Sequence, residues 1–531
     1  MTYHASAFCI AMEGMRGHLV DVQADLSEGA VTYSLVGRPD ASVREATERC
    51  RAAVANSGFT WPATQRVTIL LSPANLRKSG PHYDLAIAVA VLGAKGTFQR
   101  EELLGTVLLG ELMLDGRIRA VPGVLPMVLA AQAAGLHRVI VPETQAGEAE
   151  LVEGVDVVGL RSLAQVVAFL RRAEQLPEAP PTPAAELVSS LRWRGEDRTA
   201  DLDMAEVVGM ADARFALEVA AAGGHHVALC GPKGAGKTTL AERVPSLLPD
   251  LRLPEALELS SIRSLAGTLA PGTPIPRRPP FRAPHHSATR ASVLGGGAGR
   301  TRPGEVSQAL HGCLFLDEFP LFAADIIESL REPLENREVT IARGEETATY
   351  PARTMFVLAY NPCPCGDYRA DAYDHLCVCT EPQRRRYRSR LSGPITDRID
   401  ITRFVLPIGP HELNDPLAAP ESSATIRGRV HLARERQAQR YADTPWRVNA
   451  DVPRAQLREL CPPDPRSAGL LDGWLTSGKL TFRGCTRVHR LAVTVADLAG
   501  LGRPGPDEFE TAFQLRVGEP LPLSRLAGVA S

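Results

Sequence analysis

Several features that mark specialised proteins are missing from this sequence of 531 residues. Its 59 Lys and Arg nearly balance its 61 Asp and Glu, so any nucleic-acid binding must come from local basic patches. The longest run of apolar or small residues, 85–94, falls well short of the roughly 18 residues that cross a bilayer. The N-terminus lacks a basic region followed by an apolar one. We therefore expect a cytoplasmic protein without a membrane partner.

Cysteine is also sparse, because ten residues in a chain of this length are too few for a secreted disulfide scaffold. Four of the ten nevertheless crowd together as C-x-C, eleven residues, C-x-C, at Cys363, Cys365, Cys377 and Cys379. Four thiolates can close a tetrahedral Zn²⁺ site that holds together a loop without a core of its own. We predict structural zinc, with His375 as a spare ligand and free thiols as the alternative.

The composition that remains is ordinary for a soluble globular protein, with 44% apolar and 23% charged residues. The length predicts about three domains. We expect them at residues 1–172, 201–410 and 411–531, with the cysteine insertion at 361–380. A linker at 173–200 contains four closely spaced prolines, which favour an extended, semi-rigid backbone.

The motif at the centre of the chain matches G-x-x-x-x-G-K-[ST] in full, as Gly231, Pro232, Lys233, Gly234, Ala235, Gly236, Lys237, Thr238 and Thr239. An apolar, strand-like segment at 226–230 precedes it and helical apolar spacing at 240–248 follows. The glycines let backbone N–H groups surround phosphate oxygens. Lys237 supplies charge to the outer phosphates, and the Thr238 hydroxyl is placed to hold Mg²⁺. The sequence therefore predicts a nucleotide-binding site.

A second apolar strand, residues 313–316, ends in the paired carboxylates of Asp317 and Glu318. Four successive apolar residues fit a strand buried on both faces. At its carboxyl end Asp317 can complete the Mg²⁺ shell, and Glu318 can orient and polarise an attacking water. Placed downstream of a phosphate loop, this pair predicts nucleotide hydrolysis.

Two further polar side chains accompany predicted strands. Asn361 follows the apolar segment 354–359 and could hold the attacking water, although a simple turn Asn is the alternative. Arg398 precedes another strand, and in a ring it could reach the γ-phosphate held by a neighbouring subunit. A local ion pair with Asp397 or Asp400 is the alternative.

Residues 1–172 form an α/β mixture. We expect strands at 30–36, 67–71, 106–109 and 138–142 and helices at 41–57 and 124–134. Residues 110–142 resemble the proteolytic domain of Lon proteases, which implies a Ser-Lys nucleophile pair. The position after Gly-Pro is His82, however, and Leu125 stands where Lon-type enzymes carry lysine. With Ser79 as the nearby hydroxyl, we expect a scaffold or contact surface in place of a peptidase.

The motifs together resemble the ComM family of magnesium-chelatase-like AAA+ ATPases. The matching segments are 282–286, 295–297, 302–305, 314–318, 361–366 and 393–400. The resemblance covers nearly the whole chain. It implies an α/β fold made of a Lon-like N-terminal domain, a P-loop AAA+ core with a parallel sheet, and a helical C-terminal lid. It also assigns Asn361 the sensor-1 role and Arg483, at a predicted helix start, the sensor-2 role of contacting the nucleotide from the lid.

ComM-type proteins are ring-forming DNA helicases that drive branch migration during natural transformation. The resemblance therefore implies a hexameric, ATP- and Mg²⁺-dependent motor that translocates on single-stranded or branched DNA. A magnesium chelatase motor subunit, which acts on a porphyrin with partner subunits, is the second interpretation. An ATP-dependent peptidase is the third.

Two insertions typical of this ATPase clade would project toward a ring pore. Residues 279–305 are rich in Gly and Arg without helical period, and residues 338–351 alternate as a hairpin. In the first, we expect contacts with DNA phosphates from Arg282, His285, His286, Arg290 and Arg300. The alternative is that the two histidines brace the loop by hydrogen bonds. A basic run at 384–390 fits either DNA phosphate or a solvated, ion-paired helix face.

Overall fold

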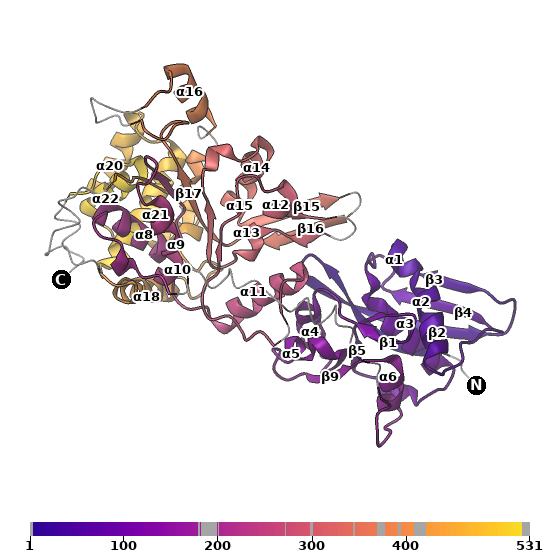
Figure 1. Cartoon of the computed structure of the whole chain (residues 1–531). Coiled ribbons are helices and arrows are strands. Elements are labelled where there is room, and N and C mark those ends of the chain that lie inside the picture. The colour runs from indigo at the N-terminus through magenta and orange to yellow at the C-terminus, as the bar shows by residue number, and fades with distance from the viewer. Residues whose placement is uncertain are drawn as a thin grey trace.

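The computed structural model describes residues 4–178, 181, 199, 201–270, 272–297, 301–343, 346–368, 377–390, 395–407 and 421–522. Two sheets organise this part of the chain, one in an N-terminal unit and one in a central unit, and helices follow toward the C-terminus (Figure 1). Arg300, His375, most of the predicted linker and residues 408–420 lie outside the described residues.

The N-terminal unit contains a mixed seven-stranded sheet. In spatial order its strands are β3 (Tyr33–Val36), β4 (Arg66–Ser72), β2 (Arg16–Ser27), β1 (His4–Glu13), β5 (Thr106–Leu108), β8 (Arg138–Pro142) and β9 (Asp156–Leu160). The pairs β1–β2 and β2–β4 are antiparallel, and the other neighbours are parallel. The four strands predicted here are confirmed within a few residues, whereas β1, β2 and β9 were not predicted.

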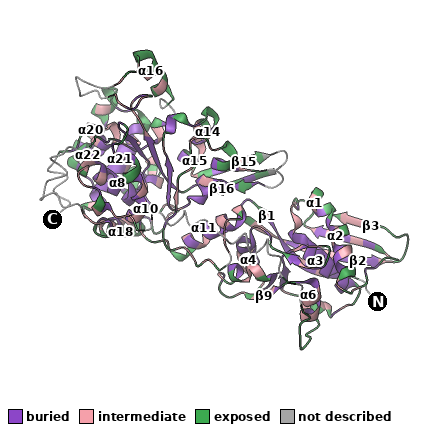
Figure 2. Ribbon diagram, viewed as in Figure 1, coloured by how far each residue is buried: buried purple, intermediate pink, exposed green. Residues whose placement is uncertain are grey.

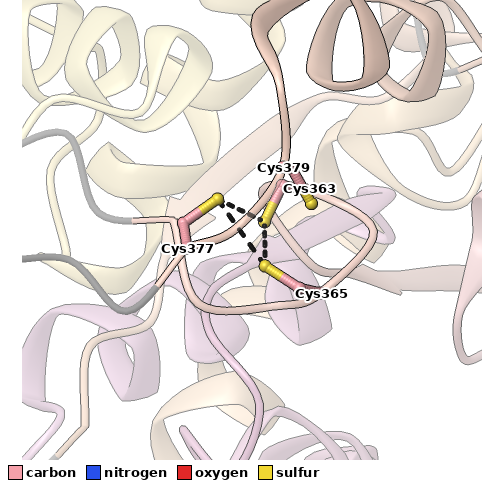
Figure 3. Close-up of side chains that lie close together, drawn as sticks. All are labelled: Cys363, Cys365, Cys377 and Cys379. Carbon is pink, nitrogen blue, oxygen red and sulfur yellow. Dashed lines mark hydrogen bonds between the residues drawn. The ribbon is translucent and has the colours of Figure 1, made fainter.

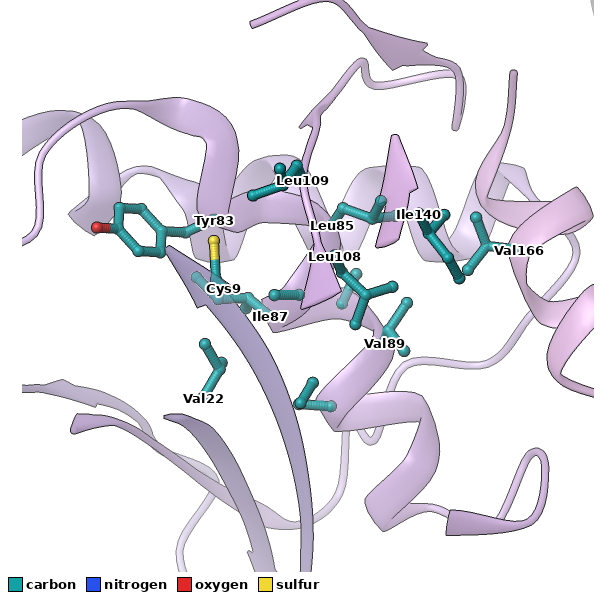
Figure 4. Close-up of a cluster of buried hydrophobic side chains, with 14 of the residues drawn as sticks. Cys9, Val22, Tyr83, Leu85, Ile87, Val89, Leu108, Leu109, Ile140 and Val166 are labelled. Carbon is teal, nitrogen blue, oxygen red and sulfur yellow. The ribbon is translucent and has the colours of Figure 1, made fainter. Parts of the chain in front are cut away.

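Helices of the N-terminal unit complete its core. They include α1 (Ala41–Arg44), α2 (Ala46–Asn56), α3 (Asp84–Ala94), α4 (Val124–Ala133), α5 (Ala146–Ala149) and α6 (Leu163–Leu170). The helix predicted at 41–57 is divided between α1 and α2. Every residue of α3 is buried, and Figure 4 shows its leucine, isoleucine and valine side chains among those of the neighbouring strands. The apolar run at 85–94 is therefore a core helix.

The central unit has a parallel five-stranded sheet, as the sequence predicted. Its order is β11 (Phe281–Arg282), β14 (Cys313–Leu316), β17 (Met355–Tyr360), β10 (Val227–Cys230) and β18 (Ile401–Phe404). All residues of β10 and β14 are buried, and Figure 2 draws the strands at the centre of this unit largely in the purple of buried residues. These strands therefore have helices or loops on both faces, which explains their uninterrupted apolar sequences.

The helices of the central unit include α8 (Ala211–Gly223), α9 (Lys237–Glu242), α10 (Val244–Leu247), α11 (Leu253–Ala266), α12 (Arg290–Leu294), α13 (Glu305–Gln308), α14 (Ala324–Ser329), α15 (Arg331–Asn336) and α16 (Glu381–Ser389). The helix predicted after the phosphate loop is divided between α9 and α10. The first insertion, residues 279–305, contains the short helix α12, which makes about one helical turn. In the same insertion, β12 (Gly295–Gly296) pairs with β13 (Arg302–Pro303). The predicted hairpin is confirmed as β15 (Glu338–Arg343) and β16 (Glu346–Pro351).

The C-terminal region is helical, also as predicted. It comprises α18 (Ser423–Arg440), α19 (Arg454–Leu460), α20 (Pro465–Thr476), α21 (Phe482–Leu498) and α22 (Pro506–Val517). Apolar residues of α18, α21 and α22 join those of α8 and β10 in one buried cluster. Across the described residues, none of the helices combines the length and apolarity needed to span a bilayer.

The two units meet where α4 and the β1–β2 turn contact α11 and β16 (Figure 1). Met12 and Met15 from the turn pack in a cluster with Leu259 and Ile262 of α11. Between the methionines, Gly14 has a φ of +59°, and a Cβ placed there would lie 2.6 Å from the Thr349 carbonyl oxygen. Glycine is required at this turn because both the backbone conformation and the close approach exclude a side chain.

A polar contact fixes the same junction. The Ser264 hydroxyl of α11 donates to Glu148 Oε1 at 2.5 Å, and the backbone carbonyl of Ser264 accepts from the Gly123 amide at 3.2 Å. Glu148 Oε1 also accepts from the Leu125 amide at 3.0 Å. Because Glu148 and Ser264 are both buried, this carboxylate joins the start of α4 to the central unit.

Candidate nucleotide site

The predicted site residues converge at one edge of the parallel sheet. The phosphate loop follows β10, Asp317 follows β14, and Asn361 follows β17, and β17 lies between the other two strands. Parallel strands place their carboxyl ends on the same edge, which is where open α/β sheets bind ligands. The topology therefore brings together groups that the sequence separates widely.

Lys237 joins the phosphate loop to Asn361. Its buried ammonium donates to the carbonyls of Gly231 and Pro232 at 2.7 and 2.8 Å and to Asn361 Oδ1 at 3.0 Å. Burial lowers the pKa of Lys237, while the negative charge of Asp317 opposes that shift. The contact with Lys237 favours a functional role for Asn361 over that of a simple turn residue.

The backbone of the phosphate loop depends on its glycines. Gly234 and Gly236 have φ values of +76° and +85°, a region that residues with a Cβ rarely adopt. A Cβ on Gly231 would lie 2.2 Å from the Val405 carbonyl oxygen, whereas one on Gly234 would meet no atom within 4 Å. The loop is thus closed at Gly231, against the residue that follows β18, and open at Gly234, as a phosphate cradle requires.

The other loop residues divide between core and surface. Ala235 is buried, whereas Lys233, Thr238 and Thr239 are exposed. Thr238 Oγ1 donates to Asp317 Oδ2 at 3.0 Å. A hydroxyl and a carboxylate on adjacent segments are the ligand types that Mg²⁺ takes in phosphate-loop enzymes. These residues fit the predicted ion.

Glu318 has a backbone conformation that few residues of its type adopt. Its φ is +49°, and such left-handed residues cluster at functional sites. Its amide donates to Asp317 Oδ1 at 2.8 Å, and its Oε2 lies 3.3 Å from Nδ1 of His286. His286, which we predicted to contact DNA, therefore lies beside the predicted catalytic carboxylate.

The other DNA-contact candidates have local partners. His285 Nδ1 lies 2.7 Å from Ser287 Oγ, which agrees with a bracing role for that histidine. Arg282 donates to Gln308 Oε1 at 2.9 Å, and Arg290 donates to Ser329 Oγ at 3.0 Å. Arg282 Nε also lies 3.7 Å from Glu305 Oε2, which offsets part of its charge. Ser329, the partner of Arg290, is neutral, so that arginine keeps a charge that can attract phosphate. Their contact with DNA stays a prediction.

Arg398 and Arg483 share a partner that the sequence did not indicate. Both donate to Glu335 of α15, Arg398 at 3.0 Å from Nε and Arg483 at 2.8 Å. The acids first considered for Arg398 have other contacts, because Asp400 pairs with Arg487 and Asp397 lies 3.8 Å from Arg516. The assigned sensor-2 arginine is thus adjacent to the predicted inter-subunit arginine.

The four predicted cysteine ligands form one cluster. Their sulfur atoms all lie within 4.8 Å of one another, and Cys377 Sγ is 3.6 Å from Sγ of both Cys363 and Cys365 (Figure 3). Tetrahedral zinc with Zn–S bonds of about 2.3 Å separates its sulfurs by about 3.8 Å. The four cysteines therefore suggest a zinc site, and their arrangement fits that ion.

Electrostatics favour metal binding by at least one of these thiols. Burial raises the pKa of Cys365, but hydrogen bonds from the Asp367 amide and the other three thiols lower it to about 6. The thiolate is the form that ligates metal. The cluster also adjoins the nucleotide site, because a Cβ on Gly366 would lie 3.3 Å from that of Lys233.

The basic run that follows the cysteines forms α16 and is partly neutralised. Arg384 and Arg385 pair with Glu381 at 2.6 and 3.2 Å. The Arg384 and Arg388 guanidinium groups lie over the Tyr368 ring at 4.4 and 5.3 Å. These contacts agree with the ion-paired helix face considered from the sequence.

The positions that resemble the Lon catalytic pair are filled by buried side chains. His82 Nε2 lies 2.9 Å from the Ile10 carbonyl oxygen, and Leu125 is fully buried. Ser79 donates to Asp40 at 2.6 Å, whereas the neighbouring Lys78 donates to the Pro73 carbonyl. Ser79 and Lys78 thus bond to separate partners and not to each other, which agrees with a scaffold role for this unit.

Comparisons with protein families define the class. Residues 203–413 match the family described as magnesium chelatase, subunit ChlI, and residues 420–516 match its C-terminal region. Residues 22–145 match subunit ChlI of Mg-chelatase. Together with the parallel sheet and the phosphate loop, these matches define a magnesium-chelatase-like ATPase of the AAA type.

Relatives over nearly the full length define the family. The chain is 45% identical to Rv2897c of Mycobacterium tuberculosis, covering 96% of this chain and 98% of the relative. It is 37% identical to YifB of Escherichia coli over 91% of each protein, and 36% identical to competence protein ComM of Haemophilus influenzae over 93% and 94%. The chain belongs to the YifB/ComM family. A match of 26% identity to a Mycolicibacterium smegmatis Lon protease covers 30% of this chain and 21% of the protease.

Proposed function

We propose that this ATPase assembles as a hexameric ring and uses ATP hydrolysis to translocate on single-stranded or branched DNA, as a branch-migration helicase in natural transformation. The observation that carries the ring is the Arg398–Glu335–Arg483 group. Two arginines with one carboxylate at a partly exposed surface retain one positive charge. Such a group suits an anion brought by another copy, and the terminal phosphate of ATP is the anion that a ring would supply.

Each residue of the nucleotide site has a role in hydrolysis under this proposal. Lys237 stabilises the outer phosphates, and Asn361, which already accepts from Lys237, helps to orient the attacking water. Glu318 orients and polarises that water, and His286 holds the carboxylate in place. Thr238 and Asp317 would hold Mg²⁺, which when bound neutralises charge on the phosphates.

Two observations support DNA as the substrate of the motor. The β15–β16 hairpin and the insertion at 279–305 resemble elements that face the pore in this ATPase clade. The second carries Arg290 beside the neutral Ser329 hydroxyl and Arg282 beside Gln308 and Glu305. The Haemophilus influenzae relative is a competence protein by name. Contacts with DNA phosphates alone would be independent of sequence, as translocation requires.

The direct test measures ATP hydrolysis by the full chain with single-stranded, duplex and four-way-junction DNA, followed by strand exchange on a labelled junction. We expect junction and single-stranded DNA to raise the hydrolysis rate and ATP to drive branch migration. Rates indifferent to every form of DNA would contradict the proposal. Arg398→Ala mixed with wild type should lower the rate more than dilution does, since each variant subunit also impairs its neighbour.

A magnesium chelatase motor subunit is the second candidate, favoured by the descriptions of the matching families. That function predicts hydrolysis that responds to a porphyrin and partner subunits and ignores DNA. The Lon-like resemblance and the cysteine cluster favour the helicase. Metal analysis of protein purified without chelator tests the zinc proposal, and we expect about one zinc per chain, lost in Cys377→Ser.

A further inference from the structure

Glu335 fixes the distance between two arginines that come from distant parts of the chain. Its Oε2 accepts from Arg398 at 3.0 and 2.5 Å, and its Oε1 accepts from Arg483 at 2.8 Å. Each arginine therefore binds its own oxygen of one carboxylate. A phosphoryl group also offers arginine neighbouring oxygens in a fork, so the spacing that Glu335 imposes is one that a phosphate can use.

Three elements meet at this carboxylate. Glu335 lies in the last turn of α15, shortly ahead of the β15–β16 hairpin. Arg398 lies in the 3₁₀ turn Thr396–Arg398, and Arg483 lies in the first turn of α21. Glu335 is 63 residues from Arg398 and 148 residues from Arg483. The contact is thus a tertiary link between the central unit and the C-terminal helices.

The backbone that carries Arg398 is already held by other contacts. Arg516 of α22 donates to the carbonyls of Thr396 and Ile399, and Arg487 of α21 pairs with Asp400. These bonds position the backbone of the turn, but they do not involve the Arg398 side chain. Glu335 Oε2 accepts from both Nε and an outer nitrogen of Arg398, so the carboxylate contributes to orienting that guanidinium group.

The group remains accessible and positively charged. The side chains of Glu335, Arg483 and Arg398 are 40%, 46% and 13% exposed. Burial raises the pKa of Glu335, but the hydrogen bond and charge of Arg398 and the charge of Arg483 lower it, so the carboxylate is ionised at neutral pH. Two cations and one anion leave a net positive charge that attracts a further anion.

We propose that Glu335 is a positioning residue for ATP hydrolysis, which holds Arg398 and Arg483 as one unit and releases that unit to the terminal phosphate of ATP on a neighbouring copy. This inference rests on the proposed ring. Glu335 itself contacts neither ATP nor water. Phosphate oxygens replace carboxylate oxygens as acceptors, so every arginine hydrogen bond lost on Glu335 is regained on the phosphate.

The test compares ATP hydrolysis and ATP binding in full-length variants. Glu335→Gln has one acceptor oxygen and no charge, so it cannot hold both arginines. We expect its kcat to fall about 10-fold or more, while the Kd for a fluorescent ATP analogue changes less than about twofold. Glu335→Asp keeps both oxygens and should recover kcat to within about threefold of wild type. Glu328→Gln is the matched control, because Glu328 pairs with Arg331 on the adjoining helix and should leave kcat unchanged.

A double variant separates positioning from simple stability. If Glu335 acts through Arg398, then adding Glu335→Gln to Arg398→Ala should lower kcat by less than about twofold, whereas independent effects would multiply. If the losses in kcat multiply, or if Glu335→Gln hydrolyses ATP as fast as an active wild type, the inference about Glu335 is wrong. Either result would still be compatible with ATPase activity. Wild-type hydrolysis that no form of DNA changes would remove the helicase proposal, while the comparison of these variants would still decide the role of Glu335.

Discussion

The N-terminal and central units both resemble enzymes that hydrolyse their substrates, but their corresponding positions hold different kinds of side chain. In the N-terminal unit these positions are His82 and Leu125, which are buried. In the central unit they are Lys237, which donates to Asn361, and Asp317, which accepts from Thr238, at the carboxyl ends of the parallel strands. The N-terminal positions are closed to a substrate, whereas Thr238 and Glu318 of the central site are exposed.

The difference shows that a fold can resemble that of an enzyme while the residues at the corresponding site differ. The N-terminal unit keeps a large core and the helix that carries lysine in Lon-type enzymes, but the start of that helix is now capped by Glu148 and contacts Ser264. In this chain, that end of the helix contacts the central unit. Function therefore has to be argued from site residues and not from fold resemblance.

The largest effect should come from Glu318, the proposed catalytic carboxylate of the central unit. Glu318→Gln removes the charge that polarises water and keeps the side chain size, so we expect ATP turnover to fall by roughly 100-fold or more. Binding of an ATP analogue should be retained. A steady-state hydrolysis assay with wild type and His285→Gln as the control checks this. Unchanged turnover would contradict the role of Glu318.

Restoring a lysine in the N-terminal unit should damage the fold and not create a peptidase. Leu125→Lys places an ammonium group in a fully buried position, and we expect a loss of about 3 kcal/mol or more in unfolding free energy. Ala133→Lys, on the exposed end of the same helix, is the control and should be nearly neutral. Denaturant unfolding and a fluorogenic peptide assay measure the two outcomes. Peptide cleavage by Leu125→Lys would support the peptidase hypothesis.

The two units should respond to acid in opposite directions. Burial raises the pKa of Asp84 to about 6, although its pairing with Arg49 opposes this. The folded carboxyl then binds a proton more tightly than an unfolded Asp does, so its contribution to stability falls by about 2 kcal/mol as pH rises from about 4 to about 6. Asp84→Asn should flatten that dependence.

In the central unit the signs are reversed. Burial would raise the pKa of Asp400, but Arg487 and His225 lower it, so its stabilisation is lost as pH falls below about 4. Burial lowers the pKa of His226 to about 3, so unfolded His226 takes up protons first and stability declines below about pH 6.5. Hydrogen exchange between pH 7 and pH 5 should show β10 losing protection before β1. The reverse order would contradict these assignments.

The smallest effect is expected at the junction between the units. Ser264→Ala removes one donor to the buried Glu148 carboxylate and should cost about 1–2 kcal/mol. Ser260→Ala, on the same helix, is a control whose buried hydroxyl has no hydrogen-bond partner among the described residues. Thermal unfolding of both variants measures the difference, and equal midpoints would show that the contact adds nothing.

Local patterns could predict most of the nucleotide site. The phosphate loop is contiguous, and Asp317 and Asn361 each follow a recognisable apolar strand, so parallel topology alone was enough to bring them together. The four cysteines were equally visible because they are close in sequence. Strand β1 was missed because alanine occupies several of its buried positions, which weakens the alternation that marks a strand.

Long-range polar contacts could not be predicted in this way. Glu335 and Glu148 lie in ordinary surface-like sequence, and nothing near either residue indicates its partner on a distant helix. The assigned roles of Arg398 and Arg483 gave no sign that both bind one carboxylate. Such pairings arise from the packing of whole elements, and periodicity carries no information about them.

The bond between Glu148 and Ser264 has a mechanical consequence. Sliding α11 away from α4 would break a hydrogen bond to a buried carboxylate. At the neighbouring contact, the Gly14 backbone lies so close to the Thr349 carbonyl that a side chain would not fit between them. Displacement of α11 or β16 during a catalytic cycle would therefore carry the seven-stranded sheet along. In the ring proposed above, each subunit would then move its N-terminal unit together with its ATPase core.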